Sequence, residues 1–383
     1  MGASDFWSAL SPELRERFGL VQRVGREELA PLAASGEEGR VNRPLLKAIA
    51  EQGILPRLFP SALGGSQESG DVSATELCLL REALAGVSTE AETALALQGL
   101  GAYPILQSGN YEVRERWIPA VARGEAVAAF ALTEPEAGSD VASLALAAER
   151  VDGGFRLSGT KKWISNAPDA DIYTVFARTT QDQGAKGLTA FGVPGDADGL
   201  SGEPLELMSA HPIGELKLDR VFVPDSHVLG EVDAGFGVAM KTLDLFRPSV
   251  GAFAVGMAQA ALGASIAHAE SRHAFGGALK DFQAISHKLA DMATSIQAAR
   301  LLVYEAAAIY DAGGRVTKAA AMAKLFATEM AQRVIDDAIS IHGAIGLERG
   351  HLLEHLYRDV RATRIYEGTS EIQREIIARE LYR

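Results

Sequence analysis

Three long helical patterns near the C-terminus constrain the fold of this 383-residue chain more than any other feature. Ala, Leu, Ile and Met recur at helical spacing over residues 236–273, 282–312 and 317–341, and Gly-Gly turns separate the three stretches. A shorter helical pattern follows at the end of the chain. Three long helices and a short one, joined by tight turns, predict an antiparallel four-helix bundle over residues 233–383.

The segment before this bundle has the texture of short strands. Strands are predicted over residues 155–159, 172–177 and 221–223, because apolar runs there are separated by turns of Gly, Asp and Pro. The pair Asp152-Gly153 is typical of a tight hairpin turn. Residues 126–232 are therefore predicted to form a small antiparallel β domain or barrel.

The N-terminal segment, residues 1–125, carries apolar positions at helical spacing. Helices are predicted over residues 45–52, 73–85, 89–108 and 111–123, with Gly and Pro between them. The predicted fold class is thus mainly α with a β middle domain. An N-terminal helical domain precedes the β domain or barrel, and the four-helix bundle follows it.

Charge and cysteine content narrow the classes of function. A net charge of -13 argues against a nucleic-acid or anionic-membrane surface. The single cysteine, Cys78, cannot form an intrachain disulfide, so a reducing compartment such as the cytoplasm is expected. Residues 250–269 come closest to a membrane span, but they are rich in Ala and Gly and include polar side chains. A buried core helix is therefore expected there.

One acidic residue near the C-terminus stands at a suggestive place. Glu367 is followed by Gly368, two hydroxyl residues and a helical pattern. Ser370 and Gln373 have the spacing of a capping box, which predicts that the helix begins at Ser370. Glu367 would then lie beside unpaired backbone N–H groups, as a general base with a place for a developing oxyanion. The alternative is a solvated charge that the helix dipole favours.

Two ten-residue motifs resemble those of the acyl-CoA dehydrogenase family. They are residues 364–373 (Arg-Ile-Tyr-Glu-Gly-Thr-Ser-Glu-Ile-Gln) and residues 131–140 (Ala-Leu-Thr-Glu-Pro-Glu-Ala-Gly-Ser-Asp). The resemblance extends over nearly all of the chain, and the predicted order of helical, β and helical domains is also that of this family.

The resemblance implies flavin-dependent α,β-dehydrogenation of a saturated acyl-CoA thioester to the trans-2-enoyl-CoA. Glu367 would abstract the α-proton, N5 of FAD would accept the β-hydride, and an electron-transferring flavoprotein would take the electrons. A free Glu titrates near ~4.3, too weak a base for this step, so burial would have to raise its pKa. The sequence has no G-x-G-x-x-G fingerprint, which disfavours a Rossmann-bound nicotinamide.

The same resemblance assigns residues to FAD. The segment around Thr133 would run along the cofactor, and Trp163 would cover the flavin face opposite the substrate. The adenine half would be held by the neighbouring subunit, which implies a homo-oligomer, either a tetramer or a dimer. The cofactor-binding residues implied in this way are Phe130, Leu132, Thr133, Gly138, Ser139, Trp163, Ile164, Ser165, Arg272, Phe275, Gln283, Ser340, Gly343, Thr369 and Glu371.

Substrate contacts follow from the resemblance as well. Residues 93–97 would help to line the acyl pocket. Some relatives carry the catalytic Glu at an upstream position where this chain has Phe246, so Glu367 is left as the matching base. The substrate-binding residues implied are Ser139, Asp244, Arg247, Gly368 and Arg379.

Two other functions remain open on the sequence. A dehydrogenase acting on carrier-protein-bound acyl thioesters in a secondary-metabolite pathway would use the same flavin chemistry. A catalytically silent binding or scaffold protein of the same fold is also possible, although Glu367 and the acidic balance count against it. The sequence leaves the length and branching of the acyl group open. It also suggests no metal site, because no Cys/His cluster has zinc spacing.

Overall fold

The computed structural model describes residues 11–68 and 72–383. The remaining parts of the predicted N-terminal domain, residues 1–10 and 69–71, lie outside the described residues. The chain forms two compact units, each assembled from separate stretches. The helical unit comprises described residues 11–30, 73–92 and 244–383, and the sheet unit comprises described residues 31–72 and 93–243. The boundaries of the three domains predicted from the sequence remain predictions.

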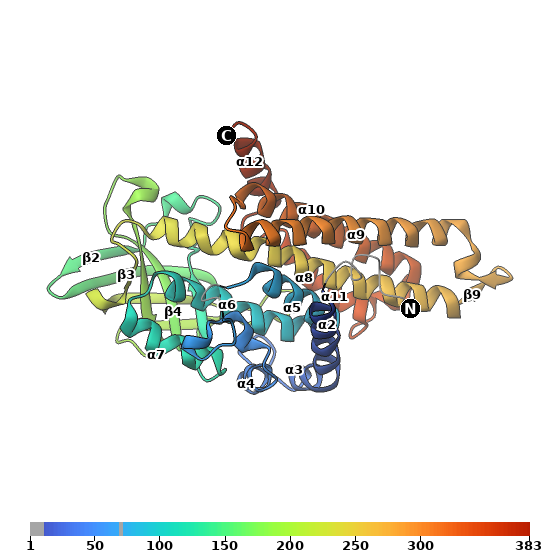
Figure 1. Cartoon of the computed structure of the whole chain (residues 1–383), viewed down its shortest axis with the longest axis horizontal. Helices are drawn as coiled ribbons and strands as arrows, with labels where there is room; N and C mark the ends of the chain where they lie inside the picture. Colours follow the sequence, from blue (N-terminus) through green and yellow to red (C-terminus); the bar gives the residue numbers. More distant parts are fainter. Residues whose placement is uncertain (1–10, 69–71) are drawn as a thin grey trace. The chain divides into compact units, whose positions relative to one another are not determined.

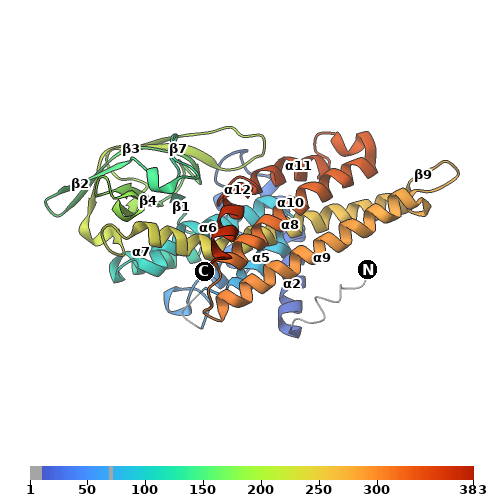
Figure 2. The ribbon, with the colours of Figure 1, turned by 90° about the horizontal axis from the view of Figure 1, so that it is seen from above.

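The helical unit contains the three long helices that the sequence predicts. In both views α8, α9 and α10 run side by side, and the β9–β10 hairpin joins α8 to α9 (Figures 1 and 2). Helix α10 packs against α9, α11 and α12. The elements of the helical unit are α2 (Pro12–Val24), a π-helix (Gly25–Leu29), α5 (Ala74–Ala85), α8 (Gly235–Ser271, from residue 244), β9 (His273–Ala274), β10 (Gly277–Ala278), α9 (Gln283–Asp311), α10 (Thr317–His342), α11 (Leu352–Thr363) and α12 (Ser370–Glu380), with 3-10 helices at Leu279–Asp281 and Gly343–Leu347.

Helix α11 was not predicted. Its apolar residues Leu353, Leu356 and Val360 do recur at helical spacing and are buried. Only twelve residues long, this helix is close to the length below which an isolated helix is marginal. Tertiary packing against α10 accounts for its stability.

Helix α8 is the core helix of this unit. A Cβ on Gly251 would lie 2.7 Å from Cγ2 of Val303 on α9, and one on Gly256 would lie 2.6 Å from Cβ of Ala85 on α5. Glycine is therefore what allows the three helices to approach so closely. The helix is long and apolar enough to cross a membrane by composition alone, but 67% of its most apolar window is buried within the protein. This burial agrees with the core helix predicted there.

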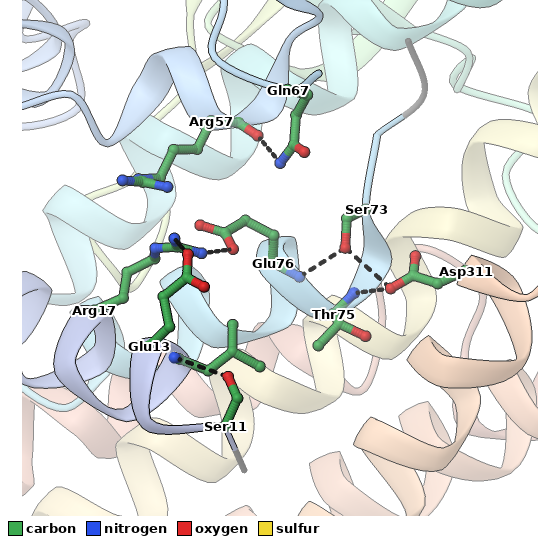
Figure 3. Close-up of polar contacts among 10 residues, drawn as sticks. Ser11, Glu13, Arg17, Arg57, Gln67, Ser73, Thr75, Glu76 and Asp311 are labelled. Carbon is green, nitrogen blue, oxygen red and sulfur yellow. Dashed lines mark hydrogen bonds and ion pairs between the residues drawn. The ribbon is translucent and has the colours of Figure 1, made fainter. Parts of the chain in front are cut away.

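Helix α5 is fixed at its N-terminus by α9. The hydroxyl of Ser73 accepts a hydrogen bond from N–H of Glu76, so Ser73 is the cap and the helix begins one residue later than predicted. The carboxylate of Asp311, at the end of α9, accepts hydrogen bonds from the Ser73 hydroxyl and from N–H of Thr75, both at 3.0 Å (Figure 3). It also accepts one from N–H of Ala74 at 2.6 Å. These bonds satisfy the unpaired donors of the first turn and hold α5 in register with α9.

The sheet unit is built on one sheet in the order β6-β7-β3-β2-β4-β5-β8, with β1 paired to β4. Most pairs are antiparallel, as predicted, and the Asp152-Gly153 turn joins β2 to β3. The β1–β4 pair is parallel. Parallel strands need a long connection, and the segment that contains the β2–β3 hairpin provides it. The strands are β1 (Ala128–Ala131), β2 (Ala147–Val151), β3 (Gly154–Ser165), β4 (Ile172–Arg178), β5 (Leu188–Pro194), β6 (Leu200–Pro204), β7 (Ile213–Pro224) and β8 (Val228–Leu229).

Several of these strands escaped prediction. Strands β1 and β2 are rich in Ala and β6 contains Gly, Glu and Pro, which are residues depleted in strands. Pairing with neighbours on the sheet outweighs their weak propensity.

The predicted helices of this region are confirmed within two residues at each end. The helices are α3 (Ala30–Ala34), α4 (Arg43–Glu51), α6 (Thr89–Ser108) and α7 (Tyr111–Ala122), with 3-10 helices at Leu55–Leu58, Ser61–Leu63, Val141–Ser143, Gly184–Gly187 and Asp225–His227.

Candidate active site

The turn between α11 and α12 carries Glu367 in a strained backbone conformation. Its φ is +53° and that of Gly368 is +91°, so both residues lie in the left-handed region. That region is free to glycine but costs other residues roughly 1–2 kcal/mol. Such a conformation persists only where the surroundings fix it, and it concentrates at functional sites.

The cap of α12 differs from the predicted capping box. Thr369, one residue before Ser370, is the N-cap, and its hydroxyl accepts a hydrogen bond from N–H of Ile372 at 3.4 Å. Ser370 is already helical, and its hydroxyl instead donates to Oε1 of Glu329 on α10 at 2.6 Å. Gln373 also does not close a capping box. The predicted start of the helix is confirmed, but the predicted cap was wrong.

Three side chains converge on two consecutive carbonyl groups of the turn, and we call them the carbonyl clamp: Arg247, Lys324 and Gln373. Nε of Arg247 donates to the carbonyl oxygen of Glu367 at 3.3 Å, and Nε2 of Gln373 donates to it at 3.0 Å. Nζ of Lys324 donates to the carbonyl oxygen of Gly368 at 2.7 Å, and Gln373 donates there too, at 2.9 Å. The clamp accounts for the fixed backbone of the turn.

The space for the clamp depends on the glycine. A Cβ on Gly368 would lie 2.7 Å from Nε2 of Gln373, closer than real Cβ contacts allow. The backbone N–H of Glu367, by contrast, has no acceptor among the described residues. With its carbonyls held and this N–H free, the turn offers one donor to a bound oxygen.

Glu367 is partly buried, and one oxygen of its carboxylate is fully buried without a hydrogen bond. Its Oε2 is inaccessible to solvent and has no partner among the described residues. Burial raises the pKa of Glu367, while the positive charges of Arg81, Lys324 and Arg247 act to lower that pKa. A raised pKa makes a stronger base, and the nearby cations favour its ionised form. This combination is what a general base requires.

The cations themselves are buried as well. Burial lowers the pKa of Lys324 to about 8, although the charge of Glu367 opposes this shift. Burial also lowers the pKa of Arg247, which Asp244 and Glu367 oppose. Three residues of this site, Lys324, Arg81 and Gln373, were not predicted from the sequence to belong to it. For Lys324 a signal was available, since it is a lone charge among apolar residues in the middle of a predicted helix, whereas Arg81 is followed directly by Glu82.

The predicted substrate residues of α8 and α12 lie in the same unit as this turn. Asp244 and Arg247 are one turn apart on α8, with Oδ1 and Nη1 separated by 3.4 Å. Burial raises the pKa of Asp244, and a hydrogen bond from Thr317 opposes the shift. Arg379 on α12 is more than half exposed and lies within electrostatic range of Arg247.

In the sheet unit, a separate group of predicted residues follows β1. Nζ of Lys161, fully buried on β3, donates to the carbonyl oxygen of Leu132 at 2.8 Å and pairs with Glu134 at 2.9 Å. N–H of Lys162 donates to the carbonyl oxygen of Thr133 at 3.0 Å. The loop after β1 is therefore fixed against β3, directly beside Trp163.

Trp163 itself points away from the core. Its φ is +56°, it lies at an irregularity in the β3–β7 register, and 47% of it is exposed. Its neighbour Ile164 is buried, and the hydroxyl of Ser165 bonds to Nε2 of His211 at 2.8 Å. Phe130 packs against Phe176, with ring centroids 5.0 Å apart. A tryptophan of the core would be buried, whereas this indole points outward from a bulge. It is therefore suited to stacking on a planar ligand.

The donor set of this region fits a flavin. The hydroxyls of Thr133 and Ser139 make no hydrogen bond to other described residues. A Cβ on Gly138 would have Thr133 Cγ2 as its nearest neighbour, at 4.0 Å, so the loop is open at this point. Free hydroxyl donors beside an exposed indole can satisfy both the polar edge and the apolar face of a flavin ring.

The remaining predicted FAD residues lie in the helical unit at the β9–β10 hairpin, at the end of α10 and at the start of α12. Phe275, at the tip of the β9–β10 hairpin, has φ +53° and is 97% exposed, and Arg272 and Gln283 flank that hairpin. Ser340 donates back to the Asp336 carbonyl of its own helix. The others are Gly343, which ends α10 with φ +70°, Thr369, which caps α12, and exposed Glu371. An exposed aromatic ring beside a cation is typical of a contact surface.

Comparisons with known proteins agree with this picture. Three acyl-CoA dehydrogenase domain models match the chain: the N-terminal domain at residues 11–125, the middle domain at 129–221 and the C-terminal domain at 233–382. The chain is 38% identical to cyclohexane-1-carbonyl-CoA dehydrogenase of Geobacter metallireducens over 375 residues, which are 97% of this chain and 98% of that protein.

Solved structures are similar as well. Butyryl-CoA dehydrogenase from Megasphaera elsdenii has 35% identity and a TM-score of 0.92, and the match covers 98% of this chain and 99% of that one. The structure of PigA with FAD and proline has 27% identity and a TM-score of 0.91, and the match covers 97% of this chain and 98% of that one.

Proposed function

Because the chain belongs to the acyl-CoA dehydrogenase family, we propose that it removes two hydrogens from Cα and Cβ of a saturated acyl-CoA, with Glu367 as the base. The enzyme is a flavoprotein oxidoreductase and its cofactor is FAD. The observation that carries the assignment of Glu367 is its buried carboxylate oxygen without a hydrogen-bond partner among the described residues. The product is the trans-2-enoyl thioester.

Each residue of the turn has a part in this proposal. Glu367 takes the α-proton, helped by burial that raises its pKa. The free N–H of Glu367 donates to the thioester oxygen, where negative charge develops as the proton leaves. The carbonyl clamp holds that N–H and the carboxylate in one orientation.

The cofactor would be held mainly by the sheet unit. Thr133, Ser139 and the Trp163 indole supply the donors and the stacking face described above. When bound, FAD supplies the acceptor for the hydride that leaves Cβ. The exposed Phe275 with Arg272 and Gln283 would contact the adenine half of FAD in a neighbouring subunit, which makes the active protein a homo-oligomer.

The substrate and electron partners complete the proposal. Asp244, Arg247, Gly368 and Arg379 would contact the CoA ester, with exposed Arg379 suited to a phosphate. An electron-transferring flavoprotein is the proposed electron acceptor. The buried free thiol of Cys78 suits a reducing compartment, and we propose the cytoplasm.

The test uses the colour of the flavin. Purified protein should be yellow and should bleach under anaerobic conditions when a suitable acyl-CoA is added. The same acyl groups presented on a carrier protein should bleach it far more slowly. Faster bleaching by carrier thioesters would establish the alternative substrate class. A yellow protein that no thioester of either kind bleaches would instead support a catalytically silent member of the fold.

A further inference from the structure

A second buried ion pair lies beside the Glu367 turn, and the proposed function does not use it. Arg81 on α5 is 4% exposed and pairs through Nε with the carboxylate of Glu92, which is fully buried. Nη1 of Arg81 donates to the hydroxyl of Ser249 on α8 at 2.7 Å. Nη2 makes no hydrogen bond to any described residue, so one donor edge of a buried guanidinium remains available.

Stability gives little reason for this pair. Removing two charges from water is costly, and replacing a buried ion pair with apolar residues is often neutral or stabilising. Apolar side chains also meet the guanidinium, since Arg81 lies over the ring of Phe253 at 5.8 Å and the same helix face of α8 carries buried Phe246. A charged group with an unused donor in such surroundings is suited to recognising a polar atom.

The position of the pair relates it to the acyl group. After burial, the charge of Arg81 has the largest effect on the pKa of Glu367, and it also acts on Tyr366. The geometry agrees: Ser249, which Arg81 contacts, lies two residues after Arg247, and Arg247 donates to the carbonyl oxygen of Glu367, so Arg81 is close to the base that must reach Cα. Glu92 directly precedes residues 93–97, the segment expected to line the acyl pocket. The resemblance that assigns residues 93–97 to the acyl pocket therefore implies that Glu92 and its partner Arg81 lie beside an acyl chain extending beyond Cβ.

We propose that Arg81 is a specificity-determining residue, an inference that rests on the proposed function. Its Nη2 donates to an oxygen acceptor on the acyl group beyond Cβ, while Glu92 and Ser249 hold the guanidinium in place. The substrates are therefore acyl-CoA thioesters whose chain carries oxygen, as a carboxylate or as a neutral carbonyl. A plain alkyl chain would leave the buried donor without a partner, which is costly.

The first experiment compares three CoA thioesters of matched chain length with the wild-type holoenzyme. One ends in a methyl group, one in a carboxylate and one in the methyl ester of that carboxylate. The readout is kcat/KM for anaerobic flavin reduction. For at least one of the two thioesters with the additional oxygen atoms, kcat/KM should exceed that of the methyl-terminated thioester by ~10-fold or more. A hydrogen bond to a charged group can account for a factor of this size. The ratio of carboxylate to methyl ester identifies which acceptor is recognised.

The second experiment removes the pair without leaving a lone charge. In the double variant Arg81→Met/Glu92→Leu, the preference for the oxygen-bearing ester should fall by ~10-fold or more, chiefly through KM. The matched control is Arg300→Met/Glu82→Leu, which removes another buried Arg–Glu pair, between α9 and α5, in which Nε and Oε1 are 2.8 Å apart. Neither Arg300 nor Glu82 is among the charges that act on Glu367, so the control should keep the wild-type preference.

The outcomes separate this inference from the proposed function. If the alkyl ester bleaches the flavin as fast as both oxygen-bearing esters, the role of Arg81 is refuted while the dehydrogenase assignment stands. Retention of the preference by a folded, flavin-loaded Arg81→Met/Glu92→Leu variant refutes it too. If no thioester bleaches the wild-type flavin, it is the proposed function that fails. Should the double variant not fold, the wild-type comparison alone decides.

Discussion

Nζ of Lys324 donates a hydrogen bond of 2.7 Å to the carbonyl oxygen of Gly368, the residue that follows Glu367. Lys324 is fully buried on α10, so this bond brings a positive charge next to the base from a distant part of the chain. One side chain therefore fixes the backbone of the turn and adjusts the ionisation of its carboxylate. These two effects can be separated by experiment.

We expect Lys324→Met to move the acid limb of the pH–rate profile to higher pH. Burial raises the pKa of Glu367, and the Lys324 charge acts in the opposite direction. Without that charge the pKa of Glu367 rises further, and the base is deprotonated only at higher pH. Measuring kcat/KM for flavin reduction across pH gives the shift.

The exposed Lys318 on the same helix supplies the control for this variant. Lys318→Met removes the same charge from α10 and should leave the acid limb unchanged. An acid limb that stays in place in folded, yellow Lys324→Met would show that Lys324 has only a structural role.

We expect Gly368→Ala to disturb the carbonyl clamp. The new Cβ would meet Nε2 of Gln373 at 2.7 Å, in addition to the roughly 1–2 kcal/mol cost of a left-handed backbone. Gly313→Ala is the matched comparison, because its φ is +70° and no atom lies within 4 Å of the Cβ position. Urea unfolding should show a larger loss of stability for Gly368→Ala, and only that variant should lose activity. Equal losses in the two variants would mean that Gln373 moves aside freely.

The order of helical, β and helical segments could be predicted from the sequence because periodicity is a local property. The long helices α8, α9 and α10 bury apolar residues at the spacing that their sequence shows. Strands β1 and β2 could not, since their Ala-rich sequences form strands only when neighbours pair with them.

The candidate site divides in the same way. Glu367 stands in a contiguous motif, so its place in a turn before a helix could be predicted. The clamp from Arg247 and Lys324 could not, because it joins residues that lie 120 and 44 positions away in the chain. The cap moved from Ser370 to Thr369 for a related reason, since Glu329 on α10 attracts the serine hydroxyl. Long-range packing decides such details.

His355 gives a pH-dependent contribution to stability. A hydrogen bond to Asp359 raises its pKa, burial opposes this, and Glu90 adds to it. Its Nε2 also contacts the Thr89 hydroxyl at 2.8 Å, so it ties α11 to the start of α6. Because the pKa of His355 is raised in the folded state, its protonated form stabilises the fold. This stabilisation is complete at pH values below the unfolded-state pKa of ~6.5 and is lost as the pH rises through the folded-state pKa.

Thermal unfolding of His355→Gln tests this statement. The melting temperature of the variant should lie below that of the wild type in acid, well under pH ~6.5, and the gap should narrow toward alkaline pH. A gap that is constant with pH would mean that the charge of His355 contributes nothing.

Assembly should control cofactor retention. Arg272, Phe275 and Gln283 lie at the hairpin end of the bundle, and the Phe275 ring is 97% exposed. If they hold FAD of a neighbouring subunit, dilution to monomers should release the flavin, and Phe275→Ser should do so at higher protein concentration. Sedimentation with detection of flavin absorbance follows both. A fully flavin-loaded, active monomer would contradict the shared site.

Glu367→Gln should abolish most of the activity and leave the fold intact. Gln keeps the size of the side chain but cannot accept the α-proton, and loss of a general base typically costs ~10²–10⁴-fold in rate. Stability should not fall, because Oε2 makes no hydrogen bond and its burial disfavours the charge that Gln lacks. Flavin content, melting temperature and anaerobic flavin reduction measure the three expectations.

Two companion variants sharpen this result. Glu375→Gln, eight residues further on and exposed on α12, removes a carboxylate outside the turn and should keep full activity. Phe246→Glu on the Glu367→Gln background places a carboxylate on α8 at a buried position and should restore part of the rate. If Glu367→Gln alone reduced the flavin at nearly the wild-type rate, another group would have to take the α-proton, and the base assigned to this turn would be wrong.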